Sequence, residues 1–413
     1  MGYQQGLSGL AGASNALDVI GNNIANANTV GFKSSTAQFS DMYANSIATS
    51  VNTQIGIGTA LASVQQQFGQ GTINTTNSSL DVAINGNGFF QMSNNGTITY
   101  TRDGTFQRDK NGYIVNSQGL NLMGYAADKN GVINTAQTVP LQAPTTNIAP
   151  TATTKITGQF NLNSQDTVPT KTPFDANDTT TYNYSTSIQV YDSLGGSQAV
   201  NIYFVKSAAG TWEAYAGVQG GTTNDLGTIQ FDSSGAISGT TTGSPATPTA
   251  ALGQFQFTVP NTDGSATPQT LTLDLTGTTQ YGGKDGVNNL AQDGYASGTL
   301  TTFTIGTDGK LTGNYSNGQT AVLGQIALAN FNNPNGLVNI GGNQYAETAA
   351  SGVPQISVPG STNHGTLQGS ALENSNVDLT SQLVNLITAQ RNYQANAQTI
   401  KTQQTVDQTL INL

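Results

Sequence analysis

The chain has 413 residues, 12 Lys plus Arg, 22 Asp plus Glu, and a formal net charge of −10. An acidic chain with scattered basic residues lacks the electrostatic footprint that nucleic-acid binding needs. The lack of Cys excludes thiolate sites, a single His excludes a His-based metal cluster, and no apolar run approaches the roughly 20 residues that span a bilayer.

The first predicted element is an amphipathic helix at the N-terminus. Its apolar residues recur in steps of three and four, at Leu7, Leu10, Ala13, Leu17, Ile20 and Ile24. We expect a tight turn at Asn22 and Asn23 and at Gly31 and Phe32 to redirect the chain from helix to β structure, although Phe32 could also be a core residue. The first basic residue is Lys33, so the sequence predicts no secretory signal peptide.

The middle of the chain is predicted to be β structure. Runs that alternate in polarity are separated by turn-forming Asn-Gly and Asp-Gly pairs, such as Asn95-Gly96 and Asp308-Gly309. A stretch rich in Pro and Thr separates two such blocks. We therefore predict a first β domain at 71–145 and 295–369, an inserted outer β domain at 146–294, and a connecting segment at 34–70.

A second helix is predicted from about 376 to about 411. Its residues form a heptad-like seam, at Leu379, Leu383, Leu386, Gln390, Tyr393, Ala397 and Ile400, which Val406, Leu410 and Leu413 continue after a slip. Ser375 and Asp378 have the spacing of a capping box. The fold class is thus mainly β with α-helical termini that pair as a coiled coil. The helical domain comprises 1–33 and 370–413, and nested, discontinuous β domains lie outside it.

The helix faces opposite the apolar stripes are almost uncharged, and charged residues make up only 8% of the chain, against about 25% in an ordinary soluble domain. Neutral faces suit close contact on all sides, since burying a charge costs several kcal/mol. The stripes could form the core of one monomer, but this pattern favours an assembly interface between copies. Its predicted residues are Leu7, Leu10, Leu17, Ile20 and Ile24 facing Leu379, Leu383, Leu386, Tyr393 and Ile400.

The sequence contains only weak candidates for metal-binding or catalytic motifs. Asp109 and Asp128 begin Asp-Lys-Asn-Gly runs that hint at calcium loops, but position 12 of each loop lacks the Glu that an EF-hand needs. A catalytic triad would have to use His364, which we expect to be a solvated loop residue. Paired carboxylates for glycoside hydrolysis stay open, although turns explain most Asp residues. We predict no catalytic, metal or cofactor site.

Both ends of the chain and several internal segments carry a family resemblance. The motifs LDVIGNNIAN at 17–26 and TVGFK at 29–33 resemble the N-terminal signature of bacterial flagellar rod and hook proteins. SNVDL at 375–379 and AQRNYQANA at 389–397 resemble their C-terminal signature. Residues 39–43, 80–84 with 88–90, and 313–317 with 323–326 are also similar to this family. The matching family-motif residues are Asn22, Asn23, Gly31, Phe32, Asn376, Asp378, Gln390 and Arg391.

The resemblance implies a structural subunit and not an enzyme. The length and the large insert are similar to hook members, which polymerise into a curved, hollow, flexible tube outside the cell and pass torque from the motor rod to the filament. It further implies flagellar rod, hook cap and hook–filament junction proteins as partners, no membrane insertion, and passage through the flagellar type III export apparatus without a cleaved signal peptide.

Two other readings stay open. A distal rod or other axial protein would share the same terminal motifs. A secreted carbohydrate-binding or adhesin-like β protein would fit the high Thr, Asn and Gly content, but not the terminal heptads. Both readings predict a structural or binding protein with no cofactor.

Overall fold

The computed structural model describes residues 2–42, 56–128, 130–144, 146–242, 247–248, 251–261 and 263–411. Tyr43, Lys129 and Leu413, which belong to motifs named above, lie outside these ranges, as does the side chain of Leu410. The chain divides into two compact units. Unit 1 comprises Met1–Thr145, Thr301–Asn314 and Thr320–Leu413, and unit 2 comprises Thr146–Leu300 and Tyr315–Gln319.

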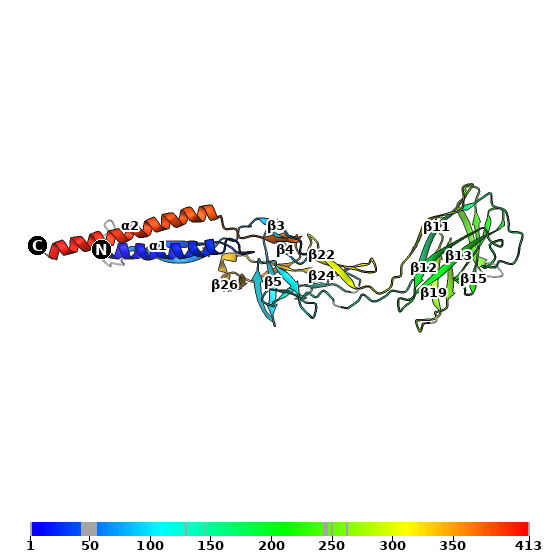
Figure 1. Ribbon diagram of the computed structural model, residues 1–413, viewed down its shortest axis with the longest axis horizontal. Coiled ribbons are helices and arrows are strands. Elements are labelled where there is room, and N and C mark those ends of the chain that lie inside the picture. Colours follow the sequence, from blue (N-terminus) through cyan, green and yellow to red (C-terminus); the bar gives the residue numbers. More distant parts are fainter. Residues whose placement is uncertain are drawn as a thin grey trace. The chain divides into compact units, whose positions relative to one another are not determined.

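The two ends of the chain form long helices that pack along each other in unit 1. Helix α1 spans Gly2–Ala25 and helix α2 spans Leu379–Ile411. They run antiparallel, because Gly6 of α1 faces Ile400 of α2 and Asn23 lies beside Gln382. Both termini therefore lie at the same end of the helix pair (Figure 1). The predicted terminal helices that pack together are confirmed.

The start of α2 corrects the predicted capping box. The Asp378 carboxylate accepts hydrogen bonds from the backbone N–H groups of Thr380 and Ser381, at 2.9 and 3.3 Å, so Asp378 is itself the N-cap. The Ser375 hydroxyl instead accepts the N–H of Val377. The helix consequently begins three residues later than predicted.

A second correction concerns the turn after α1. Asn22 and Asn23 lie inside the helix, which continues to Ala25, and the turn is made by residues 26–31. Gly31 has a φ of 69°, and a Cβ there would lie 2.7 Å from backbone atoms of Arg102 and Asp103. Only glycine fits such a position, so the predicted turn is right at Gly31 and wrong at the two asparagines.

A β-hairpin follows this turn and packs on α1. Strand β1 (Ser35–Met42) pairs antiparallel with β2 (Gly58–Gln66), with a register shift between Gln38 and Phe39. Gly12 of α1 faces the Phe39 ring and the Thr59 methyl group. An isolated two-stranded hairpin is marginal in water, so contact with α1 stabilises this one.

The rest of unit 1 is β structure around two apolar clusters. One is built on Phe90, Met92, Ile114, Leu122 and Leu328, and the other on Phe89, Tyr100, Phe331 and Tyr345. Two short pairs join distant parts of the chain: β3 (Ile73–Thr75) with β30 (Ala371–Glu373), and β4 (Val82–Asn85) with β29 (Thr366–Gly369).

The main sheet of this region is formed by strands from both sides of the insert. Its members are β5 (Phe89–Asn94), β6 (Thr97–Thr101), β7 (Phe106–Arg108), β8 (Ile114–Asn116), β9 (Asn121–Ala126), β10 (Val139–Pro140), β22 (Leu300–Ile305), β23 (Lys310–Tyr315), β24 (Thr320–Ile326), β25 (Leu328–Asn330), β26 (Val338–Gly341), β27 (Gln344–Ala346) and β28 (Gln355–Ser357). A 3₁₀ turn spans Pro334–Gly336. The predicted Asn95-Gly96 turn joins β5 to β6, with φ values of 49° and 100°.

Unit 2 consists of two sheets that share one core. The first contains β11 (Lys155–Asn163), β18 (Gln254–Val259), β19 (Gln269–Asp274), β20 (Thr279–Tyr281) and β21 (Gly286–Gln292). The second runs in chain order: β12 (Tyr184–Tyr191), β13 (Ser197–Ala208), β14 (Thr211–Val218), β15 (Thr223–Phe231), β16 (Ile237–Thr242) and β17 (Thr247–Pro248).

Strict alternation explains why β11 forms. Ile156, Phe160 and Leu162 point inward, and the polar residues between them are partly exposed. The predicted fold class, mainly β with helical termini and discontinuous β regions, is confirmed. No helix within the described ranges is both long and apolar enough to cross a membrane.

Candidate assembly interface

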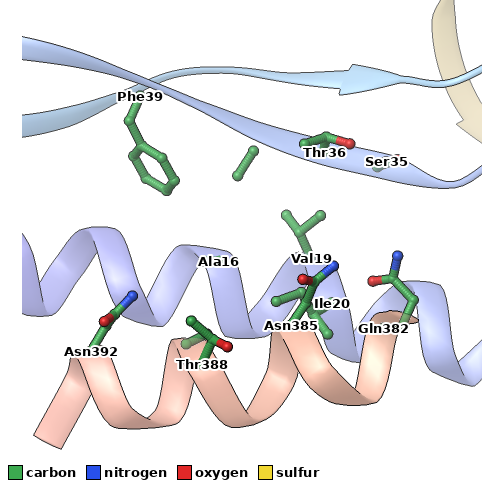
Figure 2. Close-up of a pocket in the computed structure, with 12 residues that line it drawn as sticks. Ala16, Val19, Ile20, Ser35, Thr36, Phe39, Gln382, Asn385, Thr388 and Asn392 are labelled. Atoms are coloured by element: carbon green, nitrogen blue, oxygen red, sulfur yellow. The ribbon is translucent and has the colours of Figure 1, made fainter. Parts of the chain in front are cut away.

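The helix pair and the hairpin enclose a shallow groove of about 270 Å³ (Figure 2). Phe39 of β1 points from the hairpin toward the helices, and Val19 and Ile20 of α1 line the floor. The α2 side is formed by amide and hydroxyl groups, at Gln382, Asn385, Thr388 and Asn392. Every lining residue is uncharged, as the sequence led us to expect of surfaces made for close contact.

Small residues let α1 approach its neighbours closely. A Cβ at Gly9 would lie 2.6 Å from the Asn396 side-chain oxygen, and one at Gly6 would lie 3.0 Å from Ile400. A Cβ at Gly21, in contrast, would meet no other part of the described chain within 4 Å. The helix thus carries glycine where α2 contacts it and also at one place where nothing in the subunit requires it.

Asn23 joins α1 to both the hairpin and α2. Its side-chain amide donates to the Ser35 carbonyl at 2.8 Å, and its carbonyl accepts the Ser35 N–H at 2.9 Å. The same amide nitrogen lies 3.4 Å from the Gln382 side-chain oxygen. This fully buried residue therefore fixes where the hairpin begins relative to the helix pair.

The predicted interface residues fall into two groups. Leu10, Leu17, Ile20 and Ile24 of α1, with Leu386 and Ile400 of α2, are partly buried within the subunit. Leu7, Leu379, Leu383 and Tyr393 are exposed, Leu7 at 52% and Leu383 at 49%. The structure therefore does not bring all of these side chains together inside one subunit. The exposed group leaves an apolar face on α2, to which Val384 and Ile387 also belong.

The other family-motif residues are also spread over two environments. Gly31 and Phe32 are buried and Asn376 is partly buried, all three at the base of the helix pair. Asn22, Asp378, Gln390 and Arg391 are exposed on the helices or at the start of α2. Asn22 accepts a hydrogen bond from the Asn26 side chain at 3.0 Å.

Sequence reasoning missed the hairpin, because it treated residues 34–70 as a connecting segment. Phe39, Leu61 and Val64 are exposed apolar residues on its strands. Their alternation is too weak to predict a strand. Gly12 of α1 is a weak signal for it, because a glycine leaves space for a ring on that face of the helix.

The motifs considered for chemistry have structural roles. Asp109 and Asp128 each use one carboxylate oxygen to accept two backbone N–H groups within their own turns. The ring nitrogens of His364 lie 3.0 and 2.9 Å from the carbonyl oxygens of Thr362 and Gln355. Within the described part of the chain, no group of three or more metal-binding side chains converges.

Four family models match the chain. They describe a flagellar basal body rod protein at residues 4–33, the flagellar hook protein FlgE/F/G D1 domain at 83–190, the flagellar basal body protein FlaE D2 domain at 161–295, and the C-terminal region of flagellar basal body rod FlgEFG proteins at 368–413. Together they cover most of the chain, including both helices and both β regions.

The relatives that match over their full length are flagellar hook proteins. The chain is 42% identical to the flagellar hook protein FlgE of Salmonella typhimurium and to that of Escherichia coli, over 100% of each chain. It is 33% identical to FlgE of Treponema pallidum, over 99% of this chain and 98% of the relative.

A crystal structure of Helicobacter pylori flagellar hook protein FlgE2 covers 73% of this chain and 100% of its own, with a TM-score of 0.50 and 16% identity, which shows a shared fold. The full-length identity sets aside the rod and adhesin-like alternatives. The chain therefore belongs to the bacterial flagellar hook protein family, as a structural subunit of the hook.

Proposed function

We propose that the subunit assembles into the hook through the outer faces of its helix pair. Apolar side chains on α2, namely Leu379, Leu383, Val384, Ile387 and Tyr393, would pack on helices of neighbouring copies. A contact between two different faces that does not close into a ring generates a helical polymer. The subunit would act as a structural element without catalytic activity.

The exposed apolar face of α2 is the observation that carries this proposal. Leu383, Val384 and Ile387 are 49%, 59% and 51% exposed within the subunit. The helix has three charged side chains in 33 residues, Arg391, Lys401 and Asp407. A helix that packs only within its own subunit normally has charged residues on its solvent-exposed face. In α2 that face carries Leu383, Val384 and Ile387 instead.

The same argument predicts that both ends are disordered in the free subunit. A helix pair that leaves much of its apolar surface in water has little burial to offset the conformational entropy of ordering about 57 residues. We propose that α1 and α2 order on assembly. An unfolded end also suits passage through the narrow flagellar type III export channel.

We also propose which other flagellar proteins the hook subunit contacts. Hook copies at the two ends of the tube would contact the rod and the hook–filament junction proteins, and the growing end would contact the hook cap. The polymer would lie outside the cell. These partners would meet the same helix faces that adjacent copies use.

A pair of matched substitutions tests the interface. Leu383→Glu places a charge on the α2 face, where burial in a contact costs several kcal/mol, so tubes should no longer form at concentrations at which the unmodified protein assembles. Leu194→Glu makes the same change at a 61% exposed site in unit 2 and should leave tubes intact. Negative-stain electron microscopy reports both outcomes. Tubes of normal length from the Leu383→Glu protein would contradict the proposal.

A further inference from the structure

Three separate segments of the chain meet at the base of the helix pair, within unit 1. They are residues 29–34 after α1, residues 67–72 after β2, and residues 373–376 before α2. Residues 67–72 and 373–376 connect the helix and hairpin region with the other strands of unit 1, and residues 29–34 connect α1 with the hairpin. Whatever holds these three segments together fixes how the helix pair is joined to the β structure.

Glu373 lies in the third segment and contacts the other two. Its carboxylate lies 2.6 Å from the Lys33 amine and accepts the backbone N–H of Gly71 at 2.8 Å. Its backbone carbonyl accepts the N–H of Gly31 at 2.8 Å. The second carboxylate oxygen lies 3.2 Å from the Arg102 guanidinium, just beyond the end of β6.

Asn376 makes a second set of bonds between the same segments. Its side-chain carbonyl accepts the Ser34 N–H at 2.8 Å. Its amide donates to the carbonyl oxygens of Gln67 and Gly69, at 2.7 and 3.1 Å. Lys33 also donates to the Gly69 carbonyl, at 2.9 Å. The junction is therefore cross-linked at several points and not by a single contact.

The charges at this junction are buried and unequal in number. The Lys33 and Glu373 side chains have no exposed surface, and that of Arg102 is 3% exposed. Two cations thus share one carboxylate. Burial and the neighbouring Arg102 lower the pKa of Lys33, and Glu373 opposes that shift. Arg102 also donates to the Gly86 carbonyl at 2.7 Å and lies 5.5 Å from the Phe89 ring centre.

We infer that Glu373 is a positioning residue that clamps the three segments, so that the helix pair and the strands of unit 1 move as one rigid body. Its negative charge is the essential property, because it offsets two buried cations. An amide at this position would keep only one acceptor oxygen and would turn an N–H₂ donor toward the other partner, so Gln removes an acceptor together with the charge. The inference concerns contacts inside one subunit, in the state in which α1 and α2 are ordered.

The test compares three full-length variants, each assembled into polymer, by hydrogen exchange of peptides that contain Gly31 and Gly71. Glu373→Gln leaves two buried cations without a counter-charge and should raise exchange at least about a hundredfold, since removing one partner of a buried pair is severely destabilising. Lys33→Met leaves a neutral Arg102–Glu373 pair and should have a much smaller effect. The double variant Lys33→Met with Glu373→Gln restores the native net charge and should exchange more slowly than Glu373→Gln alone.

Lys171→Met is the matched control, because it removes a lysine from an exposed ion pair with Asp178 in unit 2. It should leave exchange at Gly31 and Gly71 unchanged. Equal exchange in Glu373→Gln and Lys33→Met would overturn the inference, as would unchanged exchange in Glu373→Gln. If Glu373→Gln does not fold, the double variant decides: recovery of the fold supports the charge clamp, and failure to recover contradicts it.

Discussion

Single glycines in α1 show how one missing methyl group can be a structural requirement. Gly9 stands where the Asn396 side chain crosses the helix, while Gly21 faces open space within the subunit. Glycine costs a helix up to about 1 kcal/mol relative to alanine, so each glycine is a weakness unless a neighbour needs the room. At Gly9 that neighbour is α2. At Gly21 no residue of the described chain lies close enough to need the room.

This difference predicts opposite outcomes for the same substitution. Gly9→Ala should lower the thermal stability of the assembled polymer, because the new methyl group displaces Asn396. Gly21→Ala should leave it unchanged or raise it by the helix-propensity gain of about 1 kcal/mol. Light scattering during heating measures both. If Gly21→Ala also destabilises the polymer, a neighbouring copy must approach α1 closely at that residue.

Asn23 and Lys33 show the limits of prediction at this scale. The sequence motif marks both residues, but nothing near them in sequence shows that Asn23 binds Ser35 or that Lys33 pairs with Glu373, 340 positions later. The Lys33–Glu373 contact forms only because the end of the chain packs beside its beginning. Sequence periodicity predicts helices and strands but not which distant segments lie side by side.

At the scale of elements, the long helix was predictable because its apolar spacing is regular over many turns. Its first residue was not, because an aspartate can serve either as the third residue of a capping box or as the cap itself. The hairpin of β1 and β2 was missed because its sequence lacks a regular pattern of apolar residues. Its strands are largely exposed on both faces, so they lack the alternation that marks a half-buried strand.

The N-cap assignment makes a direct prediction. Asp378→Ala should destabilise the first turn of α2 by about 1 kcal/mol, since two N–H groups lose their acceptor. Asp378→Asn should retain most of the stability. Ser375→Ala, which would be equally harmful if the capping box had formed, should change the first turn little. Hydrogen exchange of the Thr380 and Ser381 amides in the polymer separates the two assignments.

At the scale of the whole molecule, alternation predicted that the insert is β structure, but not which strands are neighbours. In unit 2, β11 lies between β19, with which it is parallel, and β21, with which it is antiparallel. Order of this kind is set by packing of the shared core across distant segments. The subdivision of this part of the chain into a helical domain, a connecting segment and a first β domain stays a prediction.

An ion pair gives unit 2 a defined response to acid. Burial tends to raise the pKa of Asp274, but Lys155, 2.8 Å away, and Thr276 outweigh it and lower that pKa to about 2. A carboxyl whose pKa is lower in the folded state stabilises the fold above its unfolded pKa near 3.9, and loses that contribution as the pH falls toward 2. Because Lys155 is half exposed, we expect on the order of 1 kcal/mol.

Asp274→Asn should therefore reduce the loss of unit 2 stability between pH 4 and pH 2, and Lys155→Met should act in the same direction. Urea unfolding followed by the fluorescence of Trp212 measures this, because Trp212 is the single Trp of the chain and lies in the core of unit 2. An identical pH profile in the wild type and in Asp274→Asn would show that the ion pair contributes nothing.

The clamp at Glu373 also has a consequence for timing. Synthesis runs from the first residue to the last, so Lys33 emerges from the ribosome 340 residues before the carboxylate that neutralises its surroundings. Until then α1 has no α2 to pack against, and burial of Lys33 would lack the counter-charge of Glu373. A partly synthesised chain therefore lacks both the Glu373 counter-charge and the α2 face that we propose for assembly.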